Sequence, residues 1–553
     1  MPSARPQTKP CHPELVEGSV LHAAPKVLDG QRPAIALGSP RRFYLALTLI
    51  TLVAVWLRLW AIDFGVPLVT HPDEPNILNP ALRMIRTHDF NPHWFIYPAL
   101  IIYIEAGVVA LVQALGHIIS LTPGQAISAE YVGGRLIMAA SGIATVPLVG
   151  LIARRMAPRR RDLAGLVAAG ILAVSYLHVK DSHFLKPDIP TAFFTALTLW
   201  FTLDALERDR RRSWLLAAGA TGLAAAAKYT GGAVGLVPAI ALILASGSWR
   251  GLLARWRLAA LMTVTALLVF LAINPYVLLD LHTFLSPDIG IVYNSIHYST
   301  GHPGAEGSDT WRWYLVYLWR HGIGPTLTPL VVAGFLAECW RLARGDRRVL
   351  LLLVFPLLYY LDSSRYVVRF DRQLIPILPF LAIIGGRWLG FLPPLRWRPG
   401  WAMRAGIAAL LLAAFAVPLV QAARLDAETA KPDLRYAARD WIRANLPTGA
   451  VVAREWYTPP VDELGDKDIY VRAVYEQTLG WYRQRGVRYL VVSEFMYGRY
   501  LTEPEQYPQE AAFYRALFTR PALVHLTRGD RYSGPEIWVF RLDDVADLLP
   551  PGP

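Results

Sequence analysis

FYLALTLITLVAVWLRLWAIDFGVPLVTHPDEP, residues 43–75, begins with a long apolar run and ends in His71-Pro72-Asp73-Glu74-Pro75. The apolar part, residues 43–62, is long enough for a helix to cross the hydrocarbon core of a bilayer. Two adjacent carboxylates, Asp73 and Glu74, therefore stand where the chain leaves the membrane. In a chain with many further apolar runs, this arrangement points to chemistry at the bilayer surface.

The composition is that of a multi-pass membrane protein. Of 553 residues, 54% are hydrophobic and 18% are charged, and the mean hydropathy is +0.32. These values exclude an ordinary soluble enzyme. The net charge of +13 would suggest nucleic-acid binding, but the arginines cluster in short runs between apolar segments, as they do in cytoplasmic loops. We therefore expect membrane lipids, and no nucleic acid, among the partners.

Twelve apolar segments approach the length of one membrane crossing. They lie at residues 43–62, 97–119, 131–153, 163–178, 188–205, 213–228, 231–247, 257–279, 322–342, 348–363, 373–391 and 403–421. Segment 97–119 opens with Tyr97-Pro98 and carries Glu105 and His117, so we interpret it as an amphipathic helix in the outer interface. The remaining eleven crossings place every arginine run on the cytoplasmic side, as the positive-inside rule requires.

This topology divides the chain into three parts. They are a disordered cytoplasmic tail at 1–40, a transmembrane domain at 41–424 whose first outer loop is 63–130, and an extracytoplasmic α/β domain at 425–553. In the last part, residues 432–442 have helical apolar spacing, and residues 488–493 and 537–540 have the pattern of buried strands. We expect the protein in the cytoplasmic membrane, with its N-terminus inside and its C-terminal domain outside.

Several motifs follow one another in a fixed order. They are His71-Pro72-Asp73-Glu74, then NPHWFIYP at 91–98, Arg135, Lys186-Pro187-Asp188, and Arg372 followed by QLIPILPF at 373–380. This order resembles the C-type (GT-C) glycosyltransferase superfamily over about residues 43–391. Within it, the motifs are most similar to the protein mannosyltransferase and aminoarabinose-transferase group (family 39-like). The resemblance implies a mainly α, polytopic membrane helix bundle of about 11 transmembrane helices with outer juxtamembrane helices.

The resemblance also implies an enzyme. Such glycosyltransferases move a sugar from a polyprenyl-phosphate donor to a protein, lipid or glycan acceptor at the outer membrane face, and the family's first-loop acid acts as the base. Carried over, that base is Asp73, with Glu74 as its partner. The chemistry agrees, because an acceptor hydroxyl needs a general base, and burial beside another acid raises a carboxyl pKa. The competing interpretation is that Asp73 only caps a helix that begins near Pro75.

A second acidic site is expected at Asp188 and Asp181. Asp181, His183 and Asp188 are also candidate ligands for a divalent cation (Mg, Mn or Zn), although solvated interface charges explain them equally. No organic cofactor is expected. The leaving lipid phosphate needs cations on the outer face, where the topology rule makes them scarce. The candidates are Arg372, Arg369, Lys228 and Lys186.

Two other classes of protein stay open at this point. An oligosaccharide ligase or polymerase that uses a polyprenyl-linked donor would also need outer-face cations but not a first-loop base. A secondary transporter would carry its polar groups at mid-membrane on paired repeats. The residues do not identify the sugar or the acceptor.

Overall fold

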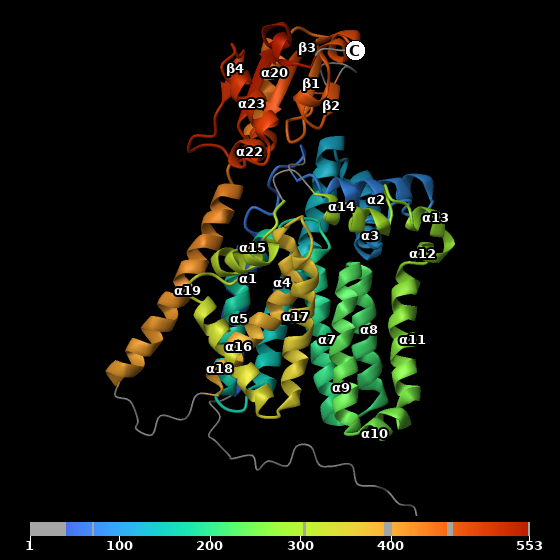
Figure 1. The fold of residues 1–553 in the computed structure, drawn as a ribbon, viewed down its shortest axis with the longest axis vertical. Coiled ribbons are helices and arrows are strands. Elements are labelled where there is room, and N and C mark those ends of the chain that lie inside the picture. The colour runs from blue at the N-terminus through green and yellow to red at the C-terminus, as the bar shows by residue number, and fades with distance from the viewer. Residues whose placement is uncertain (1–39, 69–70, 302–305, 392–400, 462–467, 551–553) are drawn as a thin grey trace, which may run out of the picture.

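The computed structural model describes residues 40–68, 71–301, 306–391, 401–461 and 468–550. Upright helices form a bundle, shorter transverse helices lie over one end of it, and a C-terminal α/β domain stands above that end (Figure 1). The predicted fold class, a largely helical membrane bundle with a small C-terminal α/β domain, agrees with this arrangement. The predicted disordered tail lies almost entirely outside the described residues.

Among the described residues, the bundle and its connections contain sixteen helical segments. They are α1 (Pro40–Leu59), α4 (Pro123–Met156), α5 (Arg161–Val174), α6 (Tyr176–Ser182), α7 (Asp188–Arg208), α8 (Arg211–Ala227), η1 (Tyr229–Gly235), α9 (Leu236–Ser246), α10 (Trp249–Ala254), α11 (Trp256–Ile273), α16 (Thr328–Ala343), η3 (Arg347–Val349), α17 (Leu350–Ser364), η4 (Asp371–Ile377), α18 (Leu378–Leu389) and α19 (Trp401–Thr429).

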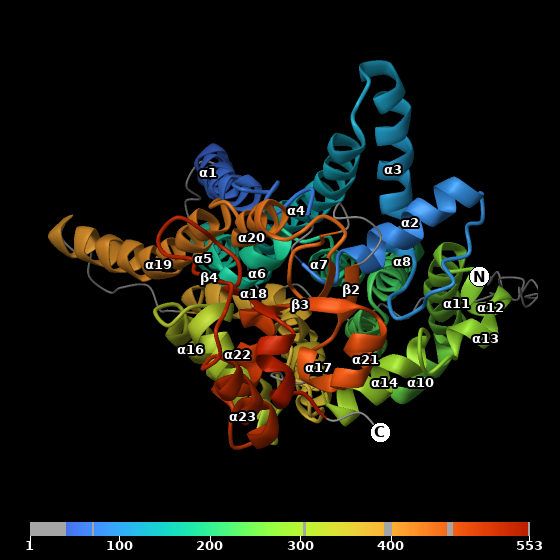
Figure 2. The same ribbon diagram turned by 90° about the horizontal axis from the view of Figure 1, so that it is seen from above.

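Further helices lie over the upper end of the bundle. They are α2 (Pro75–Thr87), α3 (Leu100–Ile119), α12 (Tyr276–Leu279), α13 (Leu281–Phe284), α14 (Ile291–Thr300), α15 (Thr310–Tyr317) and η2 (Leu318–Gly322). Seen from above, α3 extends in the plane of the view, whereas in the side view it is foreshortened above the bundle (Figures 1 and 2). It therefore lies across the bundle axis, in agreement with the prediction that the 97–119 segment does not cross.

Within the residues that the structure describes, six helices are long and apolar enough to cross a membrane. A seventh is added if α5 and α6, which meet at a bend of 57°, form one span. The predicted eleven crossings are therefore not confirmed. Several of the predicted crossings are occupied by shorter helices, such as α16 with 16 residues and α17 with 15. The protein is nevertheless a membrane protein by the number of these apolar helices.

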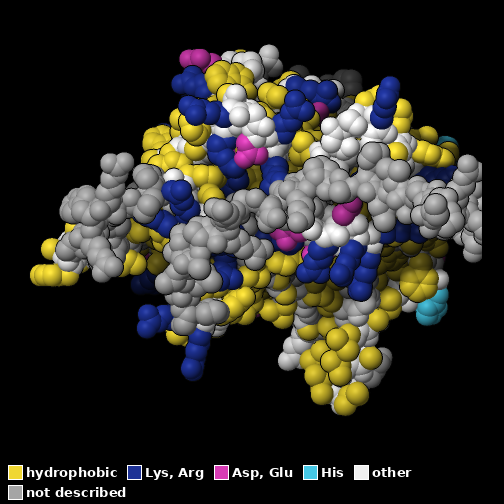
Figure 3. Space-filling view, turned by 90° about the horizontal axis from the view of Figure 1, so that it is seen from below, with side chains coloured by type: hydrophobic (Ala, Val, Ile, Leu, Met, Phe, Trp, Pro, Cys, Tyr) yellow, Lys and Arg dark blue, Asp and Glu magenta, His cyan; other side chains and the backbone are white. Residues whose placement is uncertain are grey.

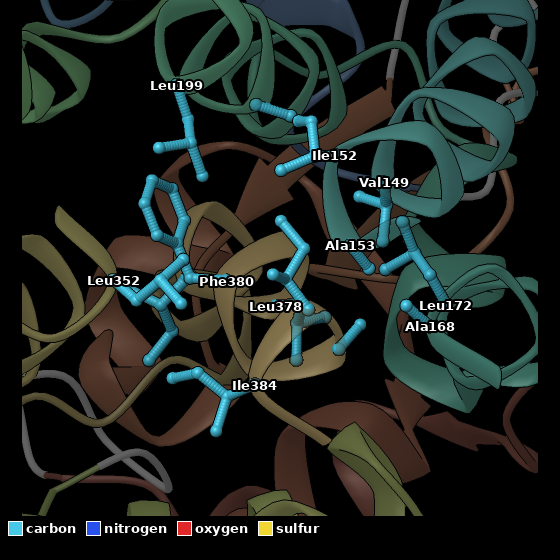
Figure 4. Packing of buried hydrophobic residues seen from close by; sticks show 14 of the residues in the cluster. Val149, Ile152, Ala153, Ala168, Leu172, Leu199, Leu352, Leu378, Phe380 and Ile384 are labelled. Atoms are coloured by element: carbon cyan, nitrogen blue, oxygen red, sulfur yellow. The ribbon is translucent and has the colours of Figure 1, made fainter. Parts of the chain in front are cut away.

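One large apolar core holds the bundle together. Val149 and Ile152 of α4 meet Leu172 of α5, while Phe380 and Ile384 of α18 approach from another side (Figure 4). Glycines allow the closest helix contacts: a Cβ on Gly334 of α16 would lie 2.4 Å from the Ile384 carbonyl oxygen. The core therefore fixes the helices whose upper ends carry the polar residues described below.

The lower face of the bundle, opposite the C-terminal domain, is rich in Lys and Arg side chains (Figure 3). It contains the connections from α4 to α5, from α7 to α8 and from α16 to α17. These connections carry the arginine runs that the sequence assigns to one side of the membrane. These three predicted runs therefore share one face, whereas Arg396 and Arg398 of the last predicted run lie outside the described residues.

The C-terminal domain is built on a five-stranded mixed sheet. Its segments are α20 (Leu434–Asn445), β1 (Val451–Glu455), β2 (Asp468–Val471), η6 (Val474–Glu476), α21 (Leu479–Gln484), β3 (Val487–Ser493), α22 (Glu494–Thr502), α23 (Pro508–Leu517), β4 (Val524–Leu526), β5 (Ile537–Arg541) and η7 (Asp543–Leu548). The strand order is β2-β1-β3-β5-β4, with β1 parallel to β2 and β3, and β5 antiparallel to β3 and β4. The helix and the two strands predicted for this domain are confirmed as α20, β3 and β5.

Helix α19 connects the two parts and leans away from the bundle at its lower end (Figure 1). The predicted domain boundary at 424/425 falls inside this helix. The domain also touches the bundle directly, because the Tyr436 hydroxyl accepts a hydrogen bond from the Leu68 backbone N–H at 3.4 Å. The C-terminal domain thus stands over the end of the bundle where the candidate site lies.

Candidate active site

Asp73 and Arg372 form the centre of the site. Asp73 lies in the turn before α2, and Arg372 lies in η4, and their Oδ2 and Nη1 atoms are 3.0 Å apart. Both side chains keep a little exposed surface, 19% for Asp73 and 18% for Arg372. The guanidinium carbon of Arg372 also lies 4.2 Å from the centre of the Phe370 ring. Two residues chosen independently from the sequence, as base and as phosphate ligand, are therefore direct neighbours.

His71 and Tyr97 complete the surroundings of Asp73. His71 Nδ1 accepts the Asp73 backbone N–H at 3.1 Å, and its ring packs 4.3 Å from the ring of Phe184. Loss of water around the imidazole, and then the charge of Lys186, lower the His71 pKa well below its usual value. Burial, and then the charge of Asp73, raise the pKa of Tyr97 well above its usual value. Both side chains are therefore neutral at physiological pH.

Glu74 points away from this centre. Both of its side-chain oxygens accept hydrogen bonds from Arg135, each at 2.8 Å, and Oε1 also accepts the Leu185 backbone N–H at 2.9 Å. Neither side chain of the pair is exposed. Glu74 occupies the N-cap position of α2 but makes no capping hydrogen bond with its side chain. The predicted partner of Asp73 is thus a buried residue that ties the first loop to α4 and to the segment before α7.

The two acids of the predicted second acidic site, Asp188 and Asp181, are each paired with a lysine. Lys228 Nζ, just after α8, donates to Asp188 Oδ1 at 2.8 Å and to Gln373 Oε1 at 3.0 Å. Lys186 Nζ lies 2.7 Å from Asp181 Oδ1. The two acids and two of the predicted phosphate-binding cations are therefore paired with each other, and all four are buried.

Four polar residues beside the centre are not among the site candidates predicted from the sequence. Lys180 of α6 and the hydroxyl of Tyr317 both donate to Asp371, which precedes Arg372. The fourth, Gln373, follows Arg372, and its Oε1 atom accepts a hydrogen bond from Lys228 Nζ. Asp371 and Gln373 flank Arg372 in the sequence, and this position is the signal by which they could be predicted as site residues. Nothing local in the sequence pairs Lys180 with a residue so far along the chain.

Arg369 has a different setting from the other predicted cations. It contacts Asp309 at 3.3 Å and Glu503 of the C-terminal domain at 3.2 Å. Its guanidinium also fills the space above Gly307, where a Cβ would come within 2.4 Å. Arg369 therefore connects the bundle to the C-terminal domain.

The predicted metal ligands do not come together. Asp181 faces Lys186 and Asp188 faces Lys228, while both ring nitrogens of His183 lie 2.9 Å from backbone oxygens, of Val179 and of Trp60. Within the described residues, no group of three or more His, Cys, Asp or Glu side chains could hold a metal ion. These three side chains therefore do not fit a divalent cation as arranged here.

Residues 108–276 match the family described as Dolichyl-phosphate-mannose-protein mannosyltransferase. The same fold occurs in the archaeal oligosaccharyltransferase AglB from Archaeoglobus fulgidus, solved with an inhibitory peptide and a dolichol-phosphate. The two share 14% identity and a TM-score of 0.56, over 85% of this chain and 72% of the other. The chain has the fold of the C-type (GT-C) glycosyltransferases. ArnT from Cupriavidus metallidurans, solved with undecaprenyl phosphate, gives 17% identity and a TM-score of 0.52, over 93% of this chain and all of the other.

The Archaeoglobus oligosaccharyltransferase was also solved with Zn and sulfate, and that structure has a TM-score of 0.51 and 14% identity, over 85% of this chain and 71% of the other. No curated protein matches the chain significantly. The GT-C fold predicted from the motif order is confirmed. The roles of the individual site residues stay predictions.

Proposed function

We propose that this GT-C chain is a glycosyltransferase that moves a sugar from a polyprenyl-phosphate donor to an acceptor hydroxyl or amine at the outer face of the cytoplasmic membrane. The observation that carries the proposal is the Asp73–Arg372 contact of 3.0 Å at one end of the bundle. A carboxylate beside a guanidinium supplies a base for the acceptor and a cation for the phosphate in one place. The dolichol-phosphate and undecaprenyl phosphate bound by the two similar structures support this class of donor.

The proposed reaction is a single inverting displacement. Asp73 takes the proton of the acceptor while the acceptor oxygen or nitrogen bonds to the anomeric carbon of the sugar. The bond from that carbon to the phosphate oxygen breaks, and its electron pair leaves with polyprenyl phosphate. Arg372 exchanges its ion pair with Asp73 for hydrogen bonds to the phosphate and stabilises the charge that develops there. The acceptor, whether protein, lipid or glycan, binds above the bundle, where the C-terminal domain also stands.

The remaining residues hold these two in place. Glu74 is a positioning residue, because its pair with Arg135 fixes the turn that presents Asp73. Lys228 and Lys186 supply further positive charge beside Arg372, and each would have to exchange a carboxylate for phosphate oxygens. Arg369 acts in the contact between the domains and not on the phosphate.

The direct test is sugar transfer by the purified full-length protein in lipid nanodiscs, with polyprenyl-phosphate sugars as donors. Asp73→Asn should lower the transfer rate by about 10²- to 10⁴-fold, the usual contribution of a general base. The matched control is Asp89→Asn, because Asp89 is an acid of the same loop whose carboxylate contacts His93 at 2.7 Å instead.

Donor binding and melting temperature are measured on both variants, so that a folding defect is separated from a loss of chemistry. Transfer by folded Asp73→Asn protein at the parent rate would overturn the assignment. A polyprenyl-diphosphate oligosaccharide is included as a second donor. Transfer of the oligosaccharide alone would favour the ligase or polymerase class.

A further inference from the structure

An apolar groove runs along α8 between α7 and α11, and encloses about 650 Å³. Its walls are formed by side chains from all three helices, including Leu197, Phe201, Leu216, Leu223, Thr265 and Val269. Arg211 and Arg212, the first residues of α8, line one end of it. The candidate active site lies beyond the opposite end of α8, where Lys228 meets Asp188.

The two arginines have no acidic partner among the residues that the structure describes. The acids beside them are already paired, since Asp204 contacts Arg208 at 3.0 Å and Asp209 contacts Arg255 at 2.7 Å. Arg211 and Arg212 are both exposed at the mouth of the groove. Two consecutive arginines that line the groove thus lack a counter-charge from the described residues, and an anion from outside can supply it.

Two glycines of α8 shape the groove. At Gly222 a Cβ would lie 2.5 Å from the Ala266 carbonyl oxygen, so α8 and α11 pack backbone to backbone there. At Gly219, which lines the groove, a Cβ would meet nothing within 4 Å. The two helices are therefore held together firmly, while the groove beside them stays open at Gly219.

We propose that this groove binds one anionic glycerophospholipid from the membrane leaflet at the arginine end. Its phosphate lies on Arg211 and Arg212 in charge-assisted hydrogen bonds, and an acyl chain packs along the apolar walls. This site goes beyond the proposed sugar transfer. The donor phosphate in that reaction belongs at Arg372, and α8, at 1.5 Å per residue, separates the two ends by about 25 Å.

The test uses the purified full-length protein in detergent micelles that contain phosphatidylglycerol, with bound lipid counted by native mass spectrometry. The Arg211→Ala/Arg212→Ala variant should lower the affinity for phosphatidylglycerol about tenfold. The matched control is Arg250→Ala/Arg257→Ala, which removes one basic residue of α10 and one of the first turn of α11, neither of which lines the groove. An equal loss in both double variants would overturn the site, as would equally tight binding of phosphatidylcholine to the parent.

A second variant tests the groove itself without changing any charge. Gly219→Leu places a side chain in the open space and should exclude the acyl chain, so that phosphatidylglycerol binding falls as it does without the arginines. Gly406→Leu is the control, because Gly406 of α19 also faces open space but lies outside the groove. Unchanged lipid binding in folded Gly219→Leu protein would refute the proposal. Displacement of phosphatidylglycerol by an equal amount of polyprenyl phosphate would refute the choice of lipid.

Discussion

Glu74 and Arg135 form an ion pair from which water is excluded, since neither side chain has any exposed surface. Glu74→Gln would leave the guanidinium buried without a carboxylate. Removing one partner of a buried pair costs about 3–5 kcal/mol. We expect a clearly lower melting temperature for the full-length variant in detergent, measured by intrinsic tryptophan fluorescence.

The comparison for this variant is Glu207→Gln. Glu207 also pairs with an arginine, Arg155 at 2.8 Å, but 44% of its side chain is exposed. Exposed pairs contribute about 1 kcal/mol or less, so the melting temperature should change little. Equal effects of the two substitutions would mean that Glu74 does not hold the loop.

Arg372 should bind the donor phosphate through the shape of its guanidinium as well as its charge. Arg372→Lys keeps the charge but loses the planar fork that grips two phosphate oxygens. The affinity for polyprenyl phosphate should fall about tenfold or more, the effect of one charge-assisted hydrogen bond. Arg365→Lys serves as control, because 67% of the Arg365 side chain is exposed. Equal losses in both variants, measured in lipid-binding titrations, would indicate general attraction to headgroups.

Part of the site can be predicted from the sequence because its residues are rare for their location. An acid pair at a membrane exit and an arginine before the last motif are conspicuous in an apolar chain, and Asp73 and Arg372 were found in this way. Sequence patterns do not show, however, in which direction a side chain points. Asp73 and Glu74 are adjacent, yet one faces Arg372 and the other is enclosed with Arg135. The contact of Lys180 with Asp371 depends on the tertiary fold alone.

At the scale of single helices, close packing depends on glycine. Gly334→Ala in α16 would drive a methyl group against the Ile384 carbonyl oxygen, which is backbone and cannot rotate away. Overpacking of this kind costs about 1–3 kcal/mol. The melting temperature of the full-length protein should fall.

A glycine-to-alanine substitution at a position where nothing packs against the helix should instead raise the melting temperature. Gly406→Ala in α19 meets nothing within 4 Å, and alanine stabilises an exposed helix by about 0.5–1 kcal/mol relative to glycine. If the melting temperature fell as much for Gly406→Ala as for Gly334→Ala, contacts between helices would not be the cause of the destabilisation.

The positions of the helices follow from apolar periodicity, but their lengths do not. The run at 163–178 is broken by the bend between α5 and α6, and the run at 373–391 starts as the short helix η4 before α18 begins. Breaks such as these lie where the chain leaves the bundle and enters the site. The number of full crossings therefore could not be read from apolar runs alone.

At the scale of the whole molecule, the C-terminal domain contains a buried acid that makes its stability depend on pH. Glu455 of β1 accepts hydrogen bonds from the Val474 and Ser493 N–H groups and from the Tyr514 hydroxyl. Burial nevertheless raises its pKa to about 7. The unfolded carboxyl ionises near its ordinary value of 4.5, so the free energy of unfolding falls by about 3 kcal/mol as pH rises from there to 7, and is then constant.

Hydrogen exchange of the full-length protein, corrected for the intrinsic pH effect, measures this loss. Amides of β1 and α23 should be better protected at pH 5 than at pH 8. Glu455→Gln should remove the difference, whereas Glu505→Gln, at an exposed position, should retain it. Equal protection of the parent protein at both pH values would contradict the expected ionisation.

The C-terminal domain itself could be predicted from its strand and helix patterns, whereas its placement could not. Residues that connect it to the bundle, such as Tyr436 and Glu503, have no distinctive sequence signal. Their partners lie far away in the chain, on loops above the bundle. Only the folded arrangement shows that this domain stands over the candidate site.

The charges of the site cancel locally. Asp73 with Arg372, Asp188 with Lys228, Asp181 with Lys186 and Asp371 with Lys180 are each an acid beside a base. Such neighbouring opposite charges have little effect beyond a few ångströms, because their fields oppose one another and salt screens the remainder. The site therefore has little net charge with which to attract free phosphate or nucleotides from the surrounding water. In the proposed reaction, a lipid-linked phosphate reaches the site by diffusing within the bilayer, so that selection of the donor begins with the carrier's solubility in the membrane.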